Sequence, residues 1–558
     1  MVTNNSDGDT TSLWSADCAL DERARLEADV TADVCIVGAG ISGLTAAYLL
    51  VREGRSVVVV DDKPPGGGQT GRTTAHLSAA LDEGFHSLEQ LHGRLGARLA
   101  AESHAAAIDR IEAICDRESI ACDFRRVDEF LFAPLGNDRE ALLQEYSAAA
   151  RAGLAVELVE RAPLPFETGA SLRFARQAQF HPLKYLAGLV RAIVRDGGQI
   201  YGATHADTIT GGEMARVQTA NGPIVTATAV IVATNAPVND LAVIHGKQSA
   251  YRTYVIAAPI PSGTVKEGLY SDTLDPYHYV RVQPCERFDM LVVGGEDHKT
   301  GQDDQPERRW EALRNWARPR FPMMGAVQYT WSGQVLEPVD GLAFIGKNPL
   351  DADNVYIATG DSGHGITGGT IAGILLTDLI QNRDNPWAAL YAPTRRTLRS
   401  VTELVRENAN VAIQYADWLK RGDVESADQI ERGQGAVVRR GLNMIATYVD
   451  DAGVHHECSA ACPHLGGRVR WNRAERTWDC PCHGSRFDPR GRVVEGPAIS
   501  DLARTDGGAR GYGARATETT NALSSSAATS CESPRSSASR LPKAISIGCA
   551  RAPTRSRG

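Results

Sequence analysis

The spacing of apolar residues changes along the chain, and each change predicts a different kind of element. After Asp33, the run VCIVGAGISGLTAAYLLVREGRSVVVVDD predicts a buried strand, a glycine turn, a helix and a second buried strand. Strand-like runs then alternate with helical patterns as far as about residue 385. Residues 277–283 and 326–331 alternate apolar and polar side chains, which is typical of antiparallel strands. This part of the chain is therefore expected to combine an α/β unit with antiparallel strands.

The last third of the chain has a different pattern. Residues 394–420 hold no Gly or Pro and place apolar side chains at helical spacing, which predicts a long helix. Strand-like runs follow from about residue 428, with a hairpin signal, DDAG, at residues 450–453. From about residue 504 the chain is rich in Ser, Ala, Arg and Gly. Such a segment holds too few large apolar side chains to fold, so a disordered tail is expected.

Composition narrows the class of protein. A chain of 558 residues is too long to fold around one hydrophobic core, so about two or three domains are expected. The net charge of -9 argues against a nucleic-acid partner, which needs a basic face. The N-terminus does not resemble a secretory signal, and no run approaches the roughly 18 apolar residues of a membrane span. The cysteines are odd in number and scattered, which favours free thiols and a cytoplasmic location over a disulfide framework.

The first glycine turn has the pattern of a dinucleotide site. Gly38, Gly40 and Gly43 fill the pattern GxGxxG, and Asp61 ends the second strand of a complete βαβ unit. Gly38 permits a tight turn, Gly40 lets the backbone approach a pyrophosphate, and Gly43 lets the helix pack on the strand. The amides at the helix N-terminus bind phosphates, and Asp61 is placed to accept hydrogen bonds from ribose hydroxyls.

A second GxGxxG pattern occupies residues 363–368, after the strand-like run VYIAT. It would indicate a separate NAD site if a second strand and an acid followed its helix. The helix instead leads into QNRDNPW, which provides neither. We therefore expect this strand and helix to return to the first sheet and to close over a flavin.

Several segments together resemble the D-amino-acid-oxidase/glycine-oxidase superfamily of FAD oxidoreductases. They are GAGISGLTAAYLL (38–50), TGRTTAH (70–76), IVATNAP (231–237), WSGQVLEPVDGLAFIG (331–346) and ATGDSGHGITGGTIAG (358–373). The resemblance spans roughly residues 30–385. It implies an α/β Rossmann-type FAD domain interleaved with an α+β substrate domain, and oxidation of a C–N bond with hydride transfer to flavin N5.

The same resemblance implies which residues surround FAD. Arg72, Thr73 and Thr74 would line the pyrophosphate and the flavin face. The second glycine turn would lie near the flavin and its ribityl chain, through Gly360, Asp361, Gly363 and Gly365. A helix N-terminus at this place would stabilise the negative charge that develops on the flavin as it is reduced.

The sequence does not identify a catalytic residue, but it offers three candidates. His364 would add to the charge stabilisation at the flavin, unless it is only a polar residue in a tight turn. Tyr279 and Arg281 lie in the strand-rich middle, where the substrate domain is expected. Arg281 would pair with a substrate carboxylate, unless it is a solvated residue on an alternating strand.

Four residues near the C-terminus have the spacing of a metal centre. Cys462 and His464 form one pair, and Cys480 and His483 form the other. Zinc sites with two Cys and two His usually pair like with like in the sequence. A mixed pair in each loop is what a Rieske [2Fe–2S] centre needs, because two thiolates hold one iron and two imidazoles hold the other. We therefore predict a Rieske cluster rather than zinc.

The segment CPHLGG–CPCHGS closely resembles the Rieske family, which implies that the two Cys ligate the inner iron and the two His the outer iron. Two positions differ from many members. Gly467 stands where a cysteine would form a disulfide with Cys482, and Phe487 stands where high-potential members have Tyr. Ser485 remains as a hydrogen-bond donor to a bridging sulfide. Fewer donors stabilise the reduced cluster less, so a potential in the lower to middle part of the Rieske range is expected.

These elements predict an FAD-dependent oxidoreductase that oxidises a C–N bond of an amine or amino acid. Its electrons would pass one at a time through the [2Fe–2S] cluster to a redox partner protein or another acceptor. One alternative is a reductase in which flavin feeds the cluster, although no second complete βαβ unit provides an NAD(P)H site. Another is a Rieske domain that acts only as a redox-sensing or docking module. A Rieske oxygenase is not expected, because the sequence shows no iron-binding pair of His with a carboxylate outside the cluster loops.

The expected fold is thus an α/β Rossmann-type FAD domain interleaved with an α+β substrate domain, followed by a small all-β Rieske domain. The expected domains are a polar lead-in (1–30), the FAD-dependent oxidoreductase (31–390), a helical linker (391–427), the Rieske domain (428–503) and a disordered tail (504–558).

Overall fold

The fold is that of a computed structural model, which describes residues 8–18, 20–134, 139–239, 244–303, 305–396 and 401–505. Side chains at residues 401–405, 407 and 412 are not part of the description. Most of the predicted tail lies outside these residues. Arg504, its first residue, forms an isolated bridge with Cys458, so this position belongs to the folded C-terminal region.

The predicted βαβ unit forms the centre of a mainly parallel sheet. Its strands run in the order β16-β17-β10-β1-β2-β7, with the β8–β9 hairpin added to β10. β17 pairs with β10 in parallel, so the strand before the second glycine turn joins the first sheet, as predicted. The strands are β1 (Val30–Val37), β2 (Val57–Val60), β7 (Gln199–Tyr201), β8 (Ala206–Thr210), β9 (Ala215–Thr219), β10 (Ile224–Val232), β16 (Phe344–Lys347) and β17 (Val355–Thr359).

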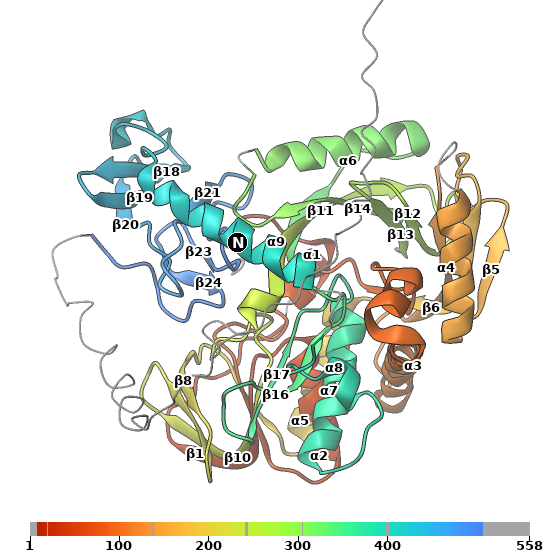
Figure 1. Ribbon diagram of the computed structural model, residues 1–558, viewed down its shortest axis with the longest axis horizontal. Coiled ribbons are helices and arrows are strands. Elements are labelled where there is room, and N and C mark those ends of the chain that lie inside the picture. The colour runs from red at the N-terminus through yellow and green to blue at the C-terminus, as the bar shows by residue number, and fades with distance from the viewer. Residues whose placement is uncertain are drawn as a thin grey trace, which may run out of the picture. The chain divides into compact units, whose positions relative to one another are not determined.

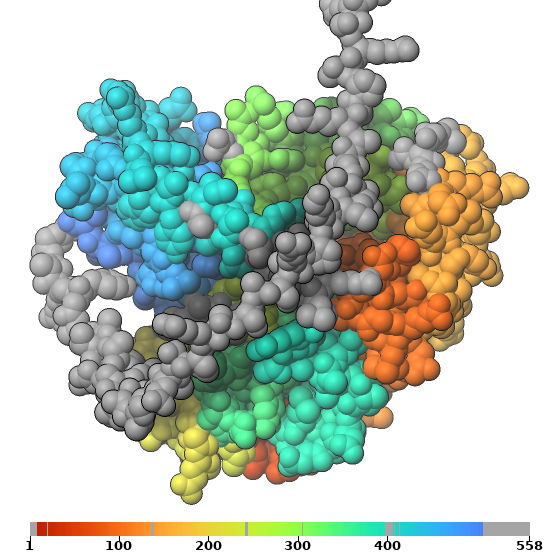
Figure 2. Space-filling view, in the orientation of Figure 1, coloured from red at the N-terminus to blue at the C-terminus, as the bar shows by residue number. Residues whose placement is uncertain are grey.

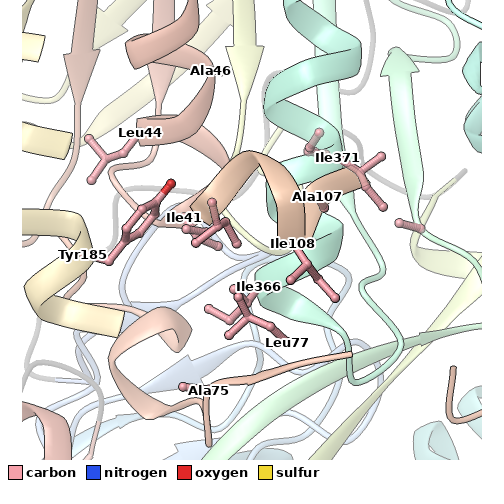
Figure 3. Close-up of a cluster of buried hydrophobic side chains, with 14 of the residues drawn as sticks. Ile41, Leu44, Ala46, Ala75, Leu77, Ala107, Ile108, Tyr185, Ile366 and Ile371 are labelled. Atoms are coloured by element: carbon pink, nitrogen blue, oxygen red, sulfur yellow. The ribbon is translucent and has the colours of Figure 1, made fainter. Parts of the chain in front are cut away.

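Two helices that follow the glycine turns pack closely against each other. α2 (Ile41–Arg52) follows the first turn and α7 (Gly365–Ile380) the second. A Cβ on Gly373 would lie 2.5 Å from Thr45 Cγ2, so glycine is needed at this crossing. Figure 3 shows apolar side chains of these helices meeting those of α3 (Phe85–Glu118) and α5 (Pro182–Arg195). The N-termini of α2 and α7 are thereby fixed in one well-packed core.

A second, mixed sheet forms the other half of this region. Its order is β15-β11-β14-β13-β12-β4-β6-β3, with β5 beside β6. Helix α6 (Glu307–Arg320) lies across β11 and β14 (Figure 1). The predicted strand at 277–283 corresponds to β13, whereas of the segment 326–331 only residues 329–331 are strand, at the start of β15. The strands are β3 (His76–Leu77), β4 (Arg125–Phe132), β5 (Val156–Val159), β6 (Ser171–Gln179), β11 (Gln248–Ile260), β12 (Leu269–Asp272), β13 (His278–Pro284), β14 (Asp289–Lys299) and β15 (Tyr329–Pro338).

The surface beside this sheet is formed by α3 and by α4 (Arg139–Ala152), which lie next to each other in Figures 1 and 2. α3 is kinked at Gly93, whose φ is 71°. No helix of the described residues is long and apolar enough to cross a membrane.

The polar lead-in packs against the rest of the protein. Its short helix α1 (Leu13–Asp17) buries Trp14 completely. The Trp14 indole donates to the Thr73 carbonyl oxygen at 2.6 Å, and the Ser12 hydroxyl donates to the Gly71 carbonyl oxygen at 2.6 Å. The lead-in therefore supports the 3₁₀ turn η1 (Gln69–Arg72) and the residue that follows it.

The predicted linker helix is shorter than expected. α9 covers Val401–Tyr415 and continues as the 3₁₀ turn η4 (Ala416–Leu419). Residues 394–396 are not helical, because the Arg395 guanidinium is held by the Asp340 carboxylate at 2.6 Å and by the carbonyl oxygen of Ala343. The 3₁₀ turn η5 (Ala427–Gln429) leads into the C-terminal region.

The C-terminal region consists of two small antiparallel sheets, β18-β19-β20 and β21-β22-β23-β24. The predicted hairpin at residues 450–453 joins β19 to β20. Trp478 and Phe487 are fully buried in the core of this region. The strands are β18 (Gln434–Arg440), β19 (Asn443–Val449), β20 (His455–Ser459), β21 (Arg470–Asn472), β22 (Thr477–Asp479), β23 (Arg486–Phe487) and β24 (Val493–Glu495).

Candidate functional site

The first glycine turn brings main-chain atoms too close together for any side chain. A Cβ on Gly38 would lie 2.4 Å from the Ala233 carbonyl oxygen, and Gly38 has a φ of 111°. A Cβ on Gly43 would lie 1.9 Å from the Gly38 carbonyl oxygen. Glycine is therefore required at both positions, and the N-terminus of α2 is left open towards a cavity.

That cavity contains almost all the residues predicted to hold FAD. The exception is Gly43, which packs α2 against the turn instead. The residues that line the cavity are Gly38, Gly40, Asp61, Arg72, Thr73, Thr74, Gly360, Asp361, Gly363 and Gly365. The structure thus brings together positions that lie in separate parts of the sequence.

Asp61 lies at the end of β2, on the wall of this cavity. Its carboxylate accepts hydrogen bonds from the backbone N–H groups of Ala39 at 2.6 Å and Lys63 at 2.8 Å. Burial and the neighbouring Asp62 carboxylate raise the pKa of Asp61 to about 7. The carboxylate therefore links the first glycine turn to the segment after β2.

The second glycine turn is held in a conformation that side chains rarely adopt. Gly360 has a φ of 70° and Gly363 a φ of 77°. A Cβ on Gly363 would lie 2.4 Å from the Asp82 carboxylate. Asp361 Oδ1 is buried without a hydrogen-bond partner, and burial raises the pKa of Asp361 to about 6. A polar ligand in the cavity would satisfy this oxygen.

His364 lies on the cavity wall, at the start of α7. Its Nε2 accepts a hydrogen bond from the Asp82 backbone N–H at 3.0 Å and is 3.4 Å from the Asp82 carboxylate. Burial lowers the pKa of His364, but Asp82, Glu129 and Glu337 together outweigh burial and raise it above its ordinary value. The ring packs edge-on against His104 at 5.6 Å. His364 is thus more than an isolated polar residue in a turn, because an acid and a second imidazole fix its position.

Tyr279 and Arg281 lie on the same strand but differ in their access to the cavity. Tyr279 lines it, and its hydroxyl is 2.9 Å from Thr253 Oγ1. Arg281 does not line it; its Nη1 donates to the carbonyl oxygens of Thr74 and Ala75 at 3.1 and 2.8 Å. Arg281 is fully buried, so the expectation of a solvated surface residue is wrong. Its guanidinium supports the 74–75 loop rather than facing the cavity.

Arg72 makes a contact that its sequence position did not suggest. Although it lines the cavity, its guanidinium pairs with Glu475 of the C-terminal region at 3.1 Å. Glu475 is also 3.5 Å from the Arg252 guanidinium, and the side chains of Glu475 and Arg252 are completely buried. Glu475 was missed because nothing in the sequence distinguishes it from a surface glutamate in a β-turn.

The four predicted cluster ligands gather in two tight loops. The Gly466 N–H donates to the Cys462 carbonyl oxygen at 2.8 Å, and the Gly484 N–H to the Cys480 carbonyl oxygen at 3.1 Å. The rings of His464 and His483 are 5.1 Å apart.

The thiols of Cys462 and Cys480 contact each other, and this hydrogen bond is the largest cause that raises the pKa of Cys462. Among the described residues, no three His, Cys, Asp or Glu side chains converge on one metal ion.

Two neighbours of the ligands are informative. The Ser485 hydroxyl accepts a hydrogen bond from the Ala498 N–H at 3.0 Å and contacts the Cys462 thiol, whose pKa it lowers against the larger effect of Cys480. A Cβ built on Gly467 would lie 2.7 Å from Cys482 Sγ and 3.4 Å from Cys482 Cβ. The position that lacks a cysteine thus lies directly against Cys482.

His245 contacts both predicted imidazole ligands, although it belongs to η2 (His245–Lys247), far away in the sequence. Its ring lies 4.9 Å from that of His464 and 6.0 Å from that of His483. The linker adds further contacts to the first loop, because the Tyr415 hydroxyl donates to Leu465 O at 2.6 Å and the Trp418 indole to Gly466 O at 3.0 Å. No sequence motif pointed to these residues.

The residues present fit both cofactors. The cavity suits a dinucleotide, because two helix N-termini and two glycine turns open onto it. The buried Asp361 Oδ1, which has no hydrogen-bond partner, would accept a hydrogen bond from the ligand. Two thiols in contact with each other and two neighbouring imidazoles supply the donor types of a Rieske cluster.

Comparisons with known proteins agree with these two sites. The sequence model of the family described as FAD dependent oxidoreductase matches residues 33–379, and that of the Rieske [2Fe-2S] domain matches residues 420–506. The chain is 33% identical over 496 residues to the Bacillus subtilis protein YhfW, whose name describes a Rieske 2Fe-2S iron-sulfur protein. This match covers 88% of this chain and 97% of YhfW.

The N-terminal part has further relatives. It is 28% identical over 382 residues to the gamma-glutamylputrescine oxidoreductase of Escherichia coli K12, which covers 64% of this chain and 85% of that protein. The crystal structure of glycine oxidase from Geobacillus kaustophilus superposes with a TM-score of 0.57 at 18% identity, over 66% of this chain and 99% of that one. This last likeness concerns the fold alone.

Proposed function

Because the chain belongs to the FAD dependent oxidoreductase family and carries a Rieske [2Fe-2S] domain, we propose that it oxidises a C–N bond of an amine or amino acid and passes the electrons to an acceptor. When bound, FAD would take a hydride from the carbon next to the nitrogen, and the cluster would carry the two electrons onward one at a time. We assign the FAD-dependent part to residues 31–390, the linker to 391–427 and the Rieske domain to 428–503.

One contact carries this proposal more than any other. Gln334 lines the FAD cavity, and its Nε2 donates to the Gly484 carbonyl oxygen at 3.1 Å, next to the proposed ligand His483. Its backbone N–H donates to Gln69 Oε1 at 2.7 Å, and Gln69 lines the cavity as well. The cavity wall and the second cluster loop are therefore in direct contact, as transfer within one chain requires.

The chain's own residues would perform the supporting chemistry. The N-terminus of α7 and His364 face the cavity and favour negative charge there. We propose Cys462, Cys480, His464 and His483 as cluster ligands, with Ser485 as a hydrogen-bond donor to the sulfur atoms around Cys462.

The charges in the cavity favour an amine over an amino acid as substrate. Asp82 and Glu129 line the cavity together with Tyr279 and His364, and the Asp82 carboxylate lies 3.4 Å from His364 Nε2. Among the described lining residues, the only Lys and Arg are Lys63 and Arg72, whose side chains are bound to Val494 O and Glu475. Arg281 is held by main-chain carbonyl groups. A cationic amino group finds two carboxylates here, whereas the lysine and arginine side chains of the described lining are already bound within the protein.

A single anaerobic titration tests the proposal. Amines and amino acids are added to the holoenzyme, with flavin bleaching and the EPR signal of the reduced cluster recorded together. Reduction of both centres by an amine supports the proposal. If no amine bleaches the flavin but NADH reduces both centres, the protein is a reductase. If the flavin is reduced while a cluster of higher potential stays oxidised, the Rieske domain is a sensing or docking module.

A further inference from the structure

The cavity that fits FAD is built by both domains. Val493, Val494, Glu495, Gly496 and Ala498 of the Rieske domain line it, opposite residues of the first glycine turn and of the segment after β2. These five residues form β24 and the chain directly after it, and are called here the closing segment. They contribute none of the four cluster ligands.

Specific hydrogen bonds hold the closing segment on the cavity. The Lys63 ammonium donates to the Val494 carbonyl oxygen. Glu495 Oε1 accepts from Gln69 Nε2 at 3.0 Å and from Asn235 Nδ2 at 3.2 Å. Lys63, Gln69 and Asn235 line the cavity themselves, so the closing segment is bound to its rim on several sides.

A second, independent contact fixes the same domain. Glu475 does not line the cavity, yet its carboxylate lies between the guanidinium groups of Arg72 and Arg252 with no exposure to solvent. Thr10 of the lead-in adds a hydrogen bond from its hydroxyl to Glu475 at 2.7 Å. Separating the domains would expose an acid and two bases that are matched only in the docked state.

We propose that the Rieske domain is a structural part of the FAD-binding site, in which the closing segment retains the dinucleotide. Bound FAD then leaves only when the closing segment moves off the cavity. Because coupling between two binding events is reciprocal, bound FAD stabilises the docked position of the Rieske domain by the same free energy by which docking stabilises bound FAD. This proposal depends on FAD as the cofactor but on neither the substrate nor the direction of electron transfer.

A reversible cross-link gives the sharpest test. A Cβ on Gly496 would lie 3.9 Å from Ala236 Cβ, within the range of about 3.5–4.5 Å found in disulfides. Ala236 is buried and lies outside the cavity, so the double variant Ala236→Cys with Gly496→Cys joins the closing segment to a part of the N-terminal domain that does not line the cavity. Mass spectrometry of non-reduced peptides establishes that the bond has formed.

The measured quantity is the rate at which the full-length holoprotein exchanges bound FAD for excess isotope-labelled FAD. We expect exchange to slow by about tenfold or more in the oxidised double variant and to recover after mild reduction, a typical size for coupling between two sites. The reduced double variant is the reference, because it carries both substitutions without the bond. The EPR signal of the cluster, recorded in every sample, shows that the Rieske domain stays folded.

Equal exchange rates in the cross-linked and reduced forms would overturn the proposal, because FAD would then leave past a fixed closing segment. Since no substrate is added and no electron is transferred, this result is separate from the fate of the proposed amine oxidation.

Discussion

The imidazole of His245 lies edge-on against that of His464, with 4.9 Å between the ring centroids and 82° between the ring planes. His245 comes from the FAD-dependent domain, is buried, and is held by a 3.1 Å hydrogen bond between its Nε2 and the Pro237 carbonyl oxygen. The two imidazoles predicted to hold the outer iron are therefore in contact with the chain's own FAD-dependent domain.

His245→Ala should alter the cluster more than the flavin. Removing the ring takes away one packing contact of the His464 and His483 imidazoles, so their orientation changes. We expect shifted EPR g-values and an approximately 10- to 100-fold slower reduction of the cluster by reduced flavin, as for other residues that orient metal ligands. Stopped-flow absorbance and EPR measure these two effects.

His456→Ala is a matched control, because His456 pairs with Asp450 in the same domain as the cluster but does not contact the predicted ligands. If His245→Ala leaves both the EPR spectrum and the rate of cluster reduction unchanged, His245 has only a packing role.

Gly467→Cys should create a disulfide with Cys482. The ideal Cβ at position 467 lies 3.4 Å from Cys482 Cβ, close to the usual separation in disulfides, and a small shift of the Cys480 thiol, 2.9 Å away, accommodates it. The new bond would join the two cluster loops and raise the free energy of unfolding by up to about 3 kcal/mol. Thiol titration and the melting temperature check this outcome. Gly467→Ser fills the same space without cross-linking, and should show no such gain.

Phe487→Tyr should raise the midpoint potential of the cluster. Phe487 is fully buried in the Rieske core and has no group that donates a hydrogen bond to sulfur. A phenol at this position adds a donor that stabilises the reduced cluster, so an increase of some tens of millivolts is expected. Phe487→Leu, which adds no donor, should not produce it. An unmodified protein whose potential already lies near the top of the Rieske range of about -150 to +300 mV would contradict this account.

Glu475→Gln should destabilise the docked arrangement of the two domains. Losing this charge leaves the buried Arg72 and Arg252 without their anion, which typically costs about 3–5 kcal/mol. Urea unfolding measures this loss. Glu457→Gln is the control, since Glu457 pairs with the exposed Arg440 and should change the free energy of unfolding by less than about 1 kcal/mol.

The ion pairs of Glu475 with Arg72 and Arg252 should make the free energy of unfolding depend on pH. Burial raises the pKa of Glu475, but Arg72 and Arg252 outweigh burial and lower it below its ordinary value. The stabilisation is therefore complete above the ordinary glutamate pKa of about 4.3 and is lost as the pH falls through the lowered pKa. Glu475→Gln should reduce the loss of the free energy of unfolding at acid pH. If the variant loses as much stability at acid pH as the unmodified protein, other carboxylates cause this loss.

The sequence predicts those site residues whose role depends only on their neighbours along the chain. Gly38 and Gly43 were predicted because a few neighbouring residues determine a glycine turn, and Cys462 and His464 because ligand spacing reflects one loop. The pairing of Arg72 with Glu475 spans 403 positions and depends on how two domains dock, which no local period encodes. The sequence did not indicate the role of His245 either, because its contact with His464 also depends on how the two domains dock. The linker helix was predicted too long because a tertiary contact of Arg395 overrides local helix propensity.

Glu129→Gln should weaken the binding of cationic amines. Glu129 lines the cavity and accepts a hydrogen bond from the Ser78 hydroxyl, and burial raises its pKa to about 7. Above this pH its carboxylate is charged and attracts an ammonium group, so the KM for an amine substrate should fall as the pH rises through about 7. The variant should raise KM about tenfold, the equivalent of one charge-assisted hydrogen bond, and should lose this pH dependence while kcat changes little. Glu267→Gln, on the exposed pair with Arg125, is the control, and equal KM profiles for the two variants would remove Glu129 from substrate binding.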